Sequence, residues 1–140
     1  MHRAVLDANV YVSAAIHADG PPGRIVQSFL RKAAFEIVLS PAIVDEVLLA
    51  LTYPKVRKLI RGDIHSGLWF EDIVMLAELV AGELVLPGVC HDPDDDKYIA
   101  AAIEGNAAFV VTGDSQLLSL AEHEGVRIVT PRAFLDLLDI

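Results

Sequence analysis

The fold is decided by the stretch Arg3-Ala4-Val5-Leu6-Asp7-Ala8-Asn9, which changes from an apolar run to a polar turn at Asp7. A short run that is apolar on both faces is typical of a parallel strand covered by helices on both sides. An aspartate directly after such a run is a common first residue of a helix, because its carboxylate caps free backbone N–H groups. The stretch therefore predicts a buried strand over Arg3–Asp7 and a helix from Asn9 to about Ile16.

The same alternation of strand and helix continues along the 140 residues. Two later helices begin with a capping residue and a proline, at Ser40-Pro41 and Thr130-Pro131, which is a typical helix start. Further strands are expected at Phe35–Leu39, Leu84–Leu86, Phe109–Thr112 and Arg127–Val129. Further helices are expected at Pro22–Ala33, from Ser40 to about Leu51, and at Lys55–Arg61, Ile64–Val80, Asp95–Glu104, Asp114–Glu122 and from Pro131 to near Ile140.

Strands separated by helices pair in parallel through right-handed crossovers. The sequence therefore predicts an α/β fold, a three-layer α/β/α sandwich with a parallel sheet of about five strands. We expect one domain over residues 1–140, because this length is ordinary for a single domain.

Composition narrows the class of protein. The 20 acidic and 11 basic residues give a net charge of −9, which argues against broad, nonspecific binding to nucleic-acid backbones. A nucleic-acid substrate remains compatible with this charge if a cation sits among the carboxylates. The single cysteine, Cys90, excludes a disulfide framework and favours a reducing, cytoplasmic setting. No apolar run approaches the roughly 18 residues that a membrane helix needs, so no membrane association is expected.

Four acidic residues from distant parts of the chain fall near predicted strand ends. Asp7 ends the first strand, Asp114 follows the Phe109–Thr112 strand, and Asp96 opens the helix before that strand. Glu46 lies near the start of the helix after the second strand. In open α/β sheets, ligands bind at the carboxyl ends of the strands. The four carboxylates could thus meet at one edge, where their repulsion would be costly without protons or a cation.

A cluster of four carboxylates predicts a binding site for a divalent cation that prefers oxygen ligands. Oxygen ligands without an accompanying Cys/His set favour Mg²⁺ or Mn²⁺ over zinc, and these metals promote phosphoryl transfer. Taken singly, each acid has an ordinary explanation: Asp7 and Asp114 as helix caps, and Glu46 as part of a solvated helix face, with Asp45 as its competitor. The run Asp92, Asp94, Asp95 and Asp96 could simply place negative charge at a helix N-terminus.

Taken together, these segments resemble the PIN-domain nucleases, in particular the toxins of toxin–antitoxin pairs. The residues that carry the resemblance are Val5–Val10, Leu39–Val47, Asp92–Ala102, Val110–Leu118 and the tail Ile128–Leu135. The resemblance implies that the metal-binding and catalytic acids are Asp7, Glu46, Asp96 and Asp114. It also implies that Asn9 and Thr112 support the metal site and that Asp92 or Asp94 is an auxiliary acid. Which acid of Asp94–Asp96 is the main ligand stays open.

The resemblance further implies the reaction and the partners. The reaction would be hydrolysis of RNA by a water bound to Mg²⁺ or Mn²⁺, and the partners would be an antitoxin protein and a second copy of the chain. The densest basic segment follows the helix that carries Glu46 and could hold the RNA backbone near the metal; a solvated helix face explains it equally well. Its basic residues are Lys55, Arg57, Lys58 and Arg61. Near Trp69 and Phe70, burial in the core competes with a protein interface.

Two other functions fit parts of the pattern. A Mg²⁺-dependent phosphatase or phosphotransferase can also place an aspartate after the first strand, but Asp7-Ala8-Asn9 lacks a second acid two residues on. A non-catalytic RNA-binding module on the same scaffold would leave an acidic cluster without use, and such a cluster destabilises the fold.

Overall fold

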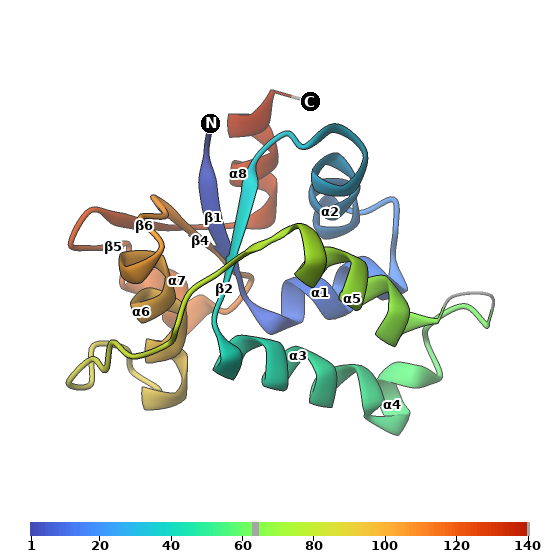
Figure 1. Cartoon of the computed structure of the whole chain (residues 1–140), viewed down its shortest axis with the longest axis horizontal. Helices are drawn as coiled ribbons and strands as arrows, with labels where there is room; N and C mark the ends of the chain where they lie inside the picture. The colour runs from blue at the N-terminus through green and yellow to red at the C-terminus, as the bar shows by residue number, and fades with distance from the viewer. Residues whose placement is uncertain (63–64, 140) are drawn as a thin grey trace.

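The computed structural model describes residues 1–62 and 65–139, in which six short strands form one sheet (Figure 1). The strand order is β3-β2-β1-β4-β6-β5. All neighbouring strands are parallel except β5 and β6, which are antiparallel. The strands are β1 (Arg3–Leu6), β2 (Glu36–Leu39), β3 (Glu78–Leu79), β4 (Phe109–Val111), β5 (Glu122–His123) and β6 (Val126–Val129).

Helices connect the parallel strands. Ser40 and Thr130 cap the helices that follow them, since their hydroxyls accept the N–H groups of Ile43 and Ala133. The proline-marked helix starts read from the sequence are thus confirmed. The helices are α1 (Ala8–Ile16), α2 (Pro21–Lys32), α3 (Pro41–Thr52), α4 (Pro54–Arg57), α5 (Ser66–Leu76), α6 (Asp96–Glu104), α7 (Ser115–Ser119) and α8 (Pro131–Leu138), with a 3₁₀ turn at Pro93–Asp95.

The sheet is the middle of three layers, as predicted. Helices α1, α2 and α8 lie on one side of the central strands and α6 lies on the other (Figure 1). The residues of β4 are all buried, as are the last three of β1 and of β2. Phe35 and Phe134 meet edge to face with their ring centroids 5.0 Å apart. Phe70 is completely buried, which confirms its assignment to the core rather than to an interface.

The prediction of a strand at Leu84–Leu86 is wrong. The strand beside β2 is instead β3, where Leu39 pairs with Leu79, so the helix predicted to reach Val80 ends at Leu76. Its predicted first residue, Ile64, lies outside the described residues. Residues 82–84 are instead held against the end of α6, because the Glu104 carboxylate accepts the N–H groups of Gly82 and Leu84, at 3.2 and 2.7 Å.

Two further helices are shorter than predicted. The helix after Asp114 ends at Ser119 instead of Glu122, because the chain turns back into the edge strand β5. Strands β5 and β6 are joined by Glu124 and Gly125, which both have positive φ (49° and 83°), as in the tight hairpin turns that suit the strand twist. The helix expected over Lys55–Arg61 covers only Pro54–Arg57. Within the described residues, no helix is long and apolar enough to cross a membrane.

Candidate functional site

The strand order creates a crevice between the carboxyl ends of β1 and β4. The chain runs from β1 outward to β2 and β3, and then returns to the opposite side of β1 as β4. Parallel sheets bind ligands at such switch points. Leu6 and Val111 are paired in register, so the residues that follow them, Asp7 and Thr112, leave the sheet at the same level.

Asp7 is fixed in this crevice by hydrogen bonds of its backbone and of its carboxylate. Its backbone N–H donates to the carbonyl of Val111 at 3.0 Å, and its Oδ1 accepts the backbone N–H of Asn9 at 3.1 Å. Thr112 donates its hydroxyl to Asp7 Oδ2 at 2.6 Å. Only 6% of Asp7 is exposed. The carboxylate therefore caps α1 and also holds a fixed position at the switch point.

Thr112 joins Asp7 to Asp114. Its buried hydroxyl accepts the backbone N–H of Asp114 at 3.0 Å while it donates to Asp7. Asp114 is half-buried and caps α7, because its Oδ1 accepts the N–H of Gln116 at 3.1 Å. The structure thus brings Thr112 together with two of the expected acids. Asn9, by contrast, contributes a backbone N–H to the network and has an exposed side chain.

Asp96 is buried but points its carboxylate at the preceding loop. Its Oδ1 accepts the N–H of Cys90 at 2.6 Å and its Oδ2 accepts the N–H of Val89 at 3.2 Å. Burial alone would raise the pKa of Asp96, but hydrogen bonds from Cys90, Val89 and Gly88 outweigh it and hold the pKa below its usual value. Both oxygens of Asp96 are therefore engaged in holding residues 88–90 against the start of α6.

Within the acidic run Asp92–Asp96, Asp95 is affected by the charges of the crevice acids. Its pKa is raised to about 6, first by burial and then by the negative charges of Asp92, Asp7 and Asp114, against a lowering by Lys97. A carboxylate responds in this way when several like charges are close and none of them is fully neutralised. The sequence placed Asp96 in the acidic set and left open which acid of Asp94–Asp96 is the main ligand. The structure favours Asp95 for this role, because the Asp96 carboxylate is directed at residues 89–90.

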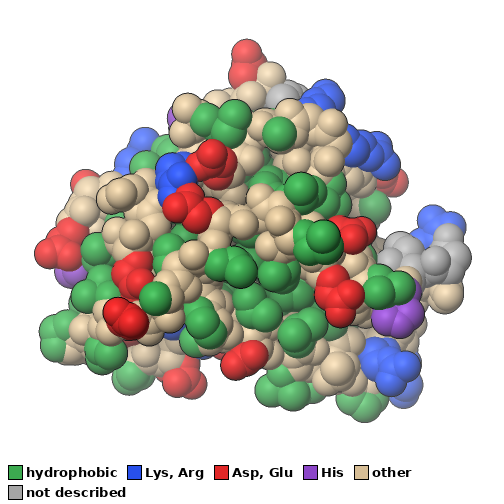
Figure 2. All heavy atoms as spheres, in the orientation of Figure 1, with side chains coloured by type: hydrophobic (Ala, Val, Ile, Leu, Met, Phe, Trp, Pro, Cys, Tyr) green, Lys and Arg blue, Asp and Glu red, His purple; other side chains and the backbone are tan. Residues whose placement is uncertain are grey.

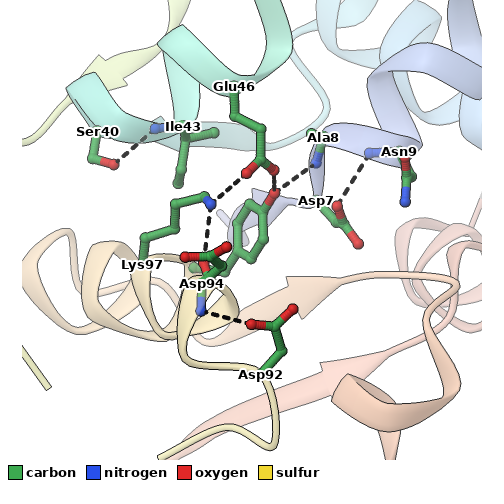
Figure 3. A network of polar contacts seen from close by, with 10 residues as sticks. Asp7, Ala8, Asn9, Ser40, Ile43, Glu46, Asp92, Asp94 and Lys97 are labelled. Carbon is green, nitrogen blue, oxygen red and sulfur yellow. Dashed lines mark hydrogen bonds and ion pairs between the residues drawn. The ribbon is translucent and has the colours of Figure 1, made fainter. Parts of the chain in front are cut away.

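Glu46 reaches the site from α3 and has both carboxylate oxygens engaged (Figure 3). Its Oε1 accepts the hydroxyl of Tyr98, and its Oε2 forms an ion pair with the ammonium of Lys97. Tyr98 Oη also accepts the backbone N–H of Ala8 at 3.3 Å. The sequence reasoning missed Tyr98 and Lys97, although both directly follow the acidic run.

The two acids expected from the resemblance to be auxiliary, Asp92 and Asp94, are exposed. Asp92 begins the 3₁₀ turn and accepts the backbone N–H of Asp94 on its Oδ1 at 3.0 Å. Asp94 supplies its carbonyl to Lys97 Nζ at 2.9 Å. Asp92 therefore contributes its charge, which acts on Asp95, and Asp94 contributes a backbone oxygen (Figure 3).

The donor atoms suit a hard divalent cation, although the side chains do not form a closed cage. Over residues 1–62 and 65–139, no three His, Cys, Asp or Glu side chains are grouped closely enough to hold a metal ion. The crevice nevertheless offers carboxylate oxygens, which are the ligands of Mg²⁺ and Mn²⁺. Burial is the largest cause of the raised pKa of Asp95, and the negative charges of Asp92, Asp7 and Asp114 add to it. The residues present therefore fit such a cation in donor type and in charge.

The raised pKa of Asp95 predicts a pH effect on the stability of the metal-free protein. Between its ordinary pKa of 3.8 and its folded value of about 6, the folded state binds more protons at Asp95 than the unfolded state. The contribution of Asp95 to stability is therefore present below pH 4 and is lost as the pH rises through 6. Urea unfolding in EDTA should show Asp95→Asn gaining stability relative to the wild type over this window; parallel pH curves would contradict the assignment.

Comparisons with known proteins identify the family of the chain. The family model described as PIN domain matches residues 3–116. An uncharacterised protein of Methanocaldococcus jannaschii, MJ1680, is 28% identical over 96% of this chain and 90% of its own length.

Two solved structures share the fold. PAE2754 from Pyrobaculum aerophilum superposes with a TM-score of 0.60 over 99% of this chain and 90% of its own, at 16% identity. VapBC2 from Rickettsia felis, bound to a DNA fragment from its promoter, gives a TM-score of 0.58 over 91% of this chain and 98% of its own, at 11% identity. Because the matched region spans most of the chain and includes Asp7, Glu46, Asp95 and Asp114, the chain belongs to the PIN domain family.

Proposed function

We propose that the chain is a metal-dependent endoribonuclease and the toxin of a toxin–antitoxin pair. The observation that carries this proposal is that Thr112 joins Asp7 to Asp114 at the switch point between β1 and β4, where their charges also act on Asp95. Membership of the PIN domain family supports nuclease chemistry. The similarity in fold to VapBC2 supports the toxin–antitoxin setting.

In this proposal, Asp7, Asp95 and Asp114 hold the Mg²⁺ or Mn²⁺ ion, and Glu46 is a further carboxylate ligand beside them. Thr112 and the N–H of Asn9 keep the Asp7 carboxylate fixed, so little ordering is needed when the cation arrives. When bound, the cation would polarise a phosphate oxygen and lower the pKa of a bound water. We assign the ligand role to Asp95 instead of Asp96, because the Asp96 carboxylate is directed at residues 89–90, whereas the charges of Asp7 and Asp114 act on Asp95.

The experiment that tests this function is incubation of the protein with a mixed RNA pool, with Mg²⁺, with Mn²⁺ and with EDTA. We expect internal cleavage of RNA with either metal and none with EDTA. Parallel reactions with single-stranded DNA and with small phosphate esters separate the alternatives. Hydrolysis of small esters without RNA cleavage would favour a phosphatase, and RNA binding without any cleavage would favour a non-catalytic module.

The basic segment lies at the corner of the molecule that carries α4, where Lys and Arg side chains are visible (Figure 2). Arg57 and Arg61 line a hollow of about 460 Å³ together with Leu48 and Thr52 of α3. At about 100° per residue, Leu48 and Thr52 lie roughly 200° and 240° around α3 from Glu46. The hollow is therefore on the opposite flank of α3 from the acidic site, and RNA would have to pass the end of α3 to contact both.

We propose that this segment, Lys55, Arg57, Lys58 and Arg61, contributes to RNA affinity rather than to the chemical step. Reversing the charge of Arg57 and Lys58 together should raise the KM for RNA about tenfold and reduce the salt dependence of binding. Mn²⁺ affinity should stay at its wild-type value. A salt titration of cleavage checks this, and an unchanged KM across the titration would exclude the segment from the RNA path.

An antitoxin and a second copy of the chain are the partners we propose. Large hydrophobic side chains are exposed on α3 and α5, among them Leu49, Met75 and Leu76 (57%, 82% and 63% exposed), and hydrophobic side chains cover the middle of the face in Figure 2. Apolar surface of this kind is typical of protein interfaces. Light scattering after size exclusion, with and without a co-expressed antitoxin candidate, tests both partners.

A further inference from the structure

The carboxylate of Glu46 is held from two sides by consecutive residues of α6. Tyr98 donates its hydroxyl to Oε1 and Lys97 places its ammonium on Oε2. Glu46 itself belongs to α3. These two contacts therefore fix the gap between α3 and α6, and they decide where the Glu46 carboxylate lies relative to the other acids.

Tyr98 connects Glu46 to the element that holds Asp7. The Tyr98 side chain is buried, with 1% exposed, and its Oη accepts the N–H of Ala8, the residue directly after Asp7. Burial, followed by the negative charge of Asp7, raises the pKa of Tyr98, so the phenol stays neutral and remains a donor. One hydroxyl thus sets the position of Glu46 against the start of α1.

Lys97 brings a positive charge to the same carboxylate. Besides the ion pair with Glu46, its Nζ donates to the carbonyl of Asp94 at 2.9 Å and lies 5.2 Å from the centroid of the Tyr98 ring. It also lowers the pKa of Asp95. Lys97 therefore offsets part of the negative charge of the acidic centre from a defined place on its rim (Figure 3).

We propose that Tyr98 is a positioning residue for Glu46 and that Lys97 is the counter-ion which a divalent cation replaces there. This inference rests on the proposed function, since the position of Glu46 matters only if the acids hold a metal. The hydrogen bond from Tyr98 to Oε1 is compatible with metal coordination through Oε2, in the way that outer hydrogen bonds orient metal ligands. The ammonium on Oε2 is not compatible with it. The two residues therefore have opposite effects on metal affinity.

The test is Mn²⁺ binding to the full chain by calorimetry, without RNA. Tyr98→Phe should weaken Mn²⁺ binding about tenfold. Lys97→Met should tighten it by about threefold to tenfold, because a competing charge is removed. Matched controls are Tyr53→Phe and Lys32→Met, which alter exposed side chains of the same types and should leave the affinity unchanged. Thermal melts establish that each variant is folded, and Lys97→Met tests the inference even if Tyr98→Phe does not fold.

A second comparison uses Glu46→Gln as the background. Because Tyr98 acts through Glu46, the change in affinity caused by Tyr98→Phe should disappear in that background. The change caused by Lys97→Met should shrink but not vanish, because Lys97 also acts on Asp95. Weaker binding by both variants, or a full-size change by either of them with Glu46→Gln, would overturn the inference. A wild-type protein that binds no Mn²⁺ would overturn both the inference and the proposed function. A wild type that binds Mn²⁺ with the expected pattern but cuts no RNA would overturn the proposed function alone.

Discussion

Asp7→Asn is expected to reduce metal-dependent RNA cleavage by about 10²- to 10³-fold while the protein stays folded. The change removes the charge at the centre of the switch point, and losing one electrostatic partner of the reaction costs an enzyme about this much. The fold survives because the asparagine oxygen can still accept the N–H of Asn9 or the hydroxyl of Thr112. We expect a loss of about 1 kcal/mol in the free energy of unfolding.

Cleavage rates and urea unfolding of the same preparations check this result. The matched control is Asp72→Asn, which changes an exposed aspartate on α5 and should cleave at the wild-type rate. If Asp7→Asn cleaves as fast as Asp72→Asn, the acidic centre is not the active site. If Asp7→Asn has lost its fold, the urea unfolding curve shows that unfolding is the cause of the lost cleavage.

Substitutions of the adjacent Asp95 and Asp96 are expected to have different effects, one on the cleavage rate and the other on stability. Asp95→Asn should lower cleavage about 10²-fold without lowering stability at neutral pH, because it removes a carboxylate that other negative charges already disfavour. Asp96→Asn should act on stability instead. An asparagine has only one acceptor oxygen for the N–H groups of Val89 and Cys90, and losing a buried, charge-assisted hydrogen bond costs about 2–3 kcal/mol.

The pair is best measured together, with kcat and the urea midpoint determined for both variants. The expected pattern is a loss of rate with a stable fold for Asp95→Asn, and a loss of stability with a smaller effect on rate for Asp96→Asn. The reverse pattern would return the metal-ligand role to Asp96, which is the assignment that the sequence alone suggested.

The sequence places Asp7 and Asp114 at the site because their strand-end positions and the resemblance to PIN-domain nucleases agree on them. Each follows a strand that is buried on both faces, and each begins a helix as its cap. The partner Thr112 follows from the same register, since it is one residue beyond the end of β4. A residue that directly follows a parallel strand lies at the carboxyl edge of the sheet, so its position can be predicted from the sequence.

Asp95 could not be chosen over Asp96 from sequence, because the direction of each side chain depends on a 3₁₀ turn and on a loop. The N–H groups of residues 88–90 bind the Asp96 carboxylate and turn it inward. No local sequence pattern predicts this contact with the loop. Strand β3 was missed for a related reason: both of its residues are exposed, so it carries no apolar run. The hairpin has a turn signal in the sequence, because Gly125 occupies its positive-φ position. The helix predicted through Glu122 nevertheless included the first residue of β5.

The contacts of Tyr98 and Lys97 with Glu46 join residues about fifty positions apart in sequence. Helical spacing relates positions within α6 or within α3, but not positions between them. Only the packing of α3 beside α6 reveals that a tyrosine and a lysine meet this glutamate.

The most direct test of the acidic centre is the location of Mn²⁺ in crystals of the wild-type protein by anomalous diffraction. We expect a peak at the carboxyl ends of β1 and β4, with oxygens of Asp7, Asp95 and Asp114 at roughly 2 Å from the ion, and no such peak in Asp7→Asn crystals. A peak on Asp96, or no peak at Mn²⁺ concentrations that support cleavage, would contradict the proposed metal site.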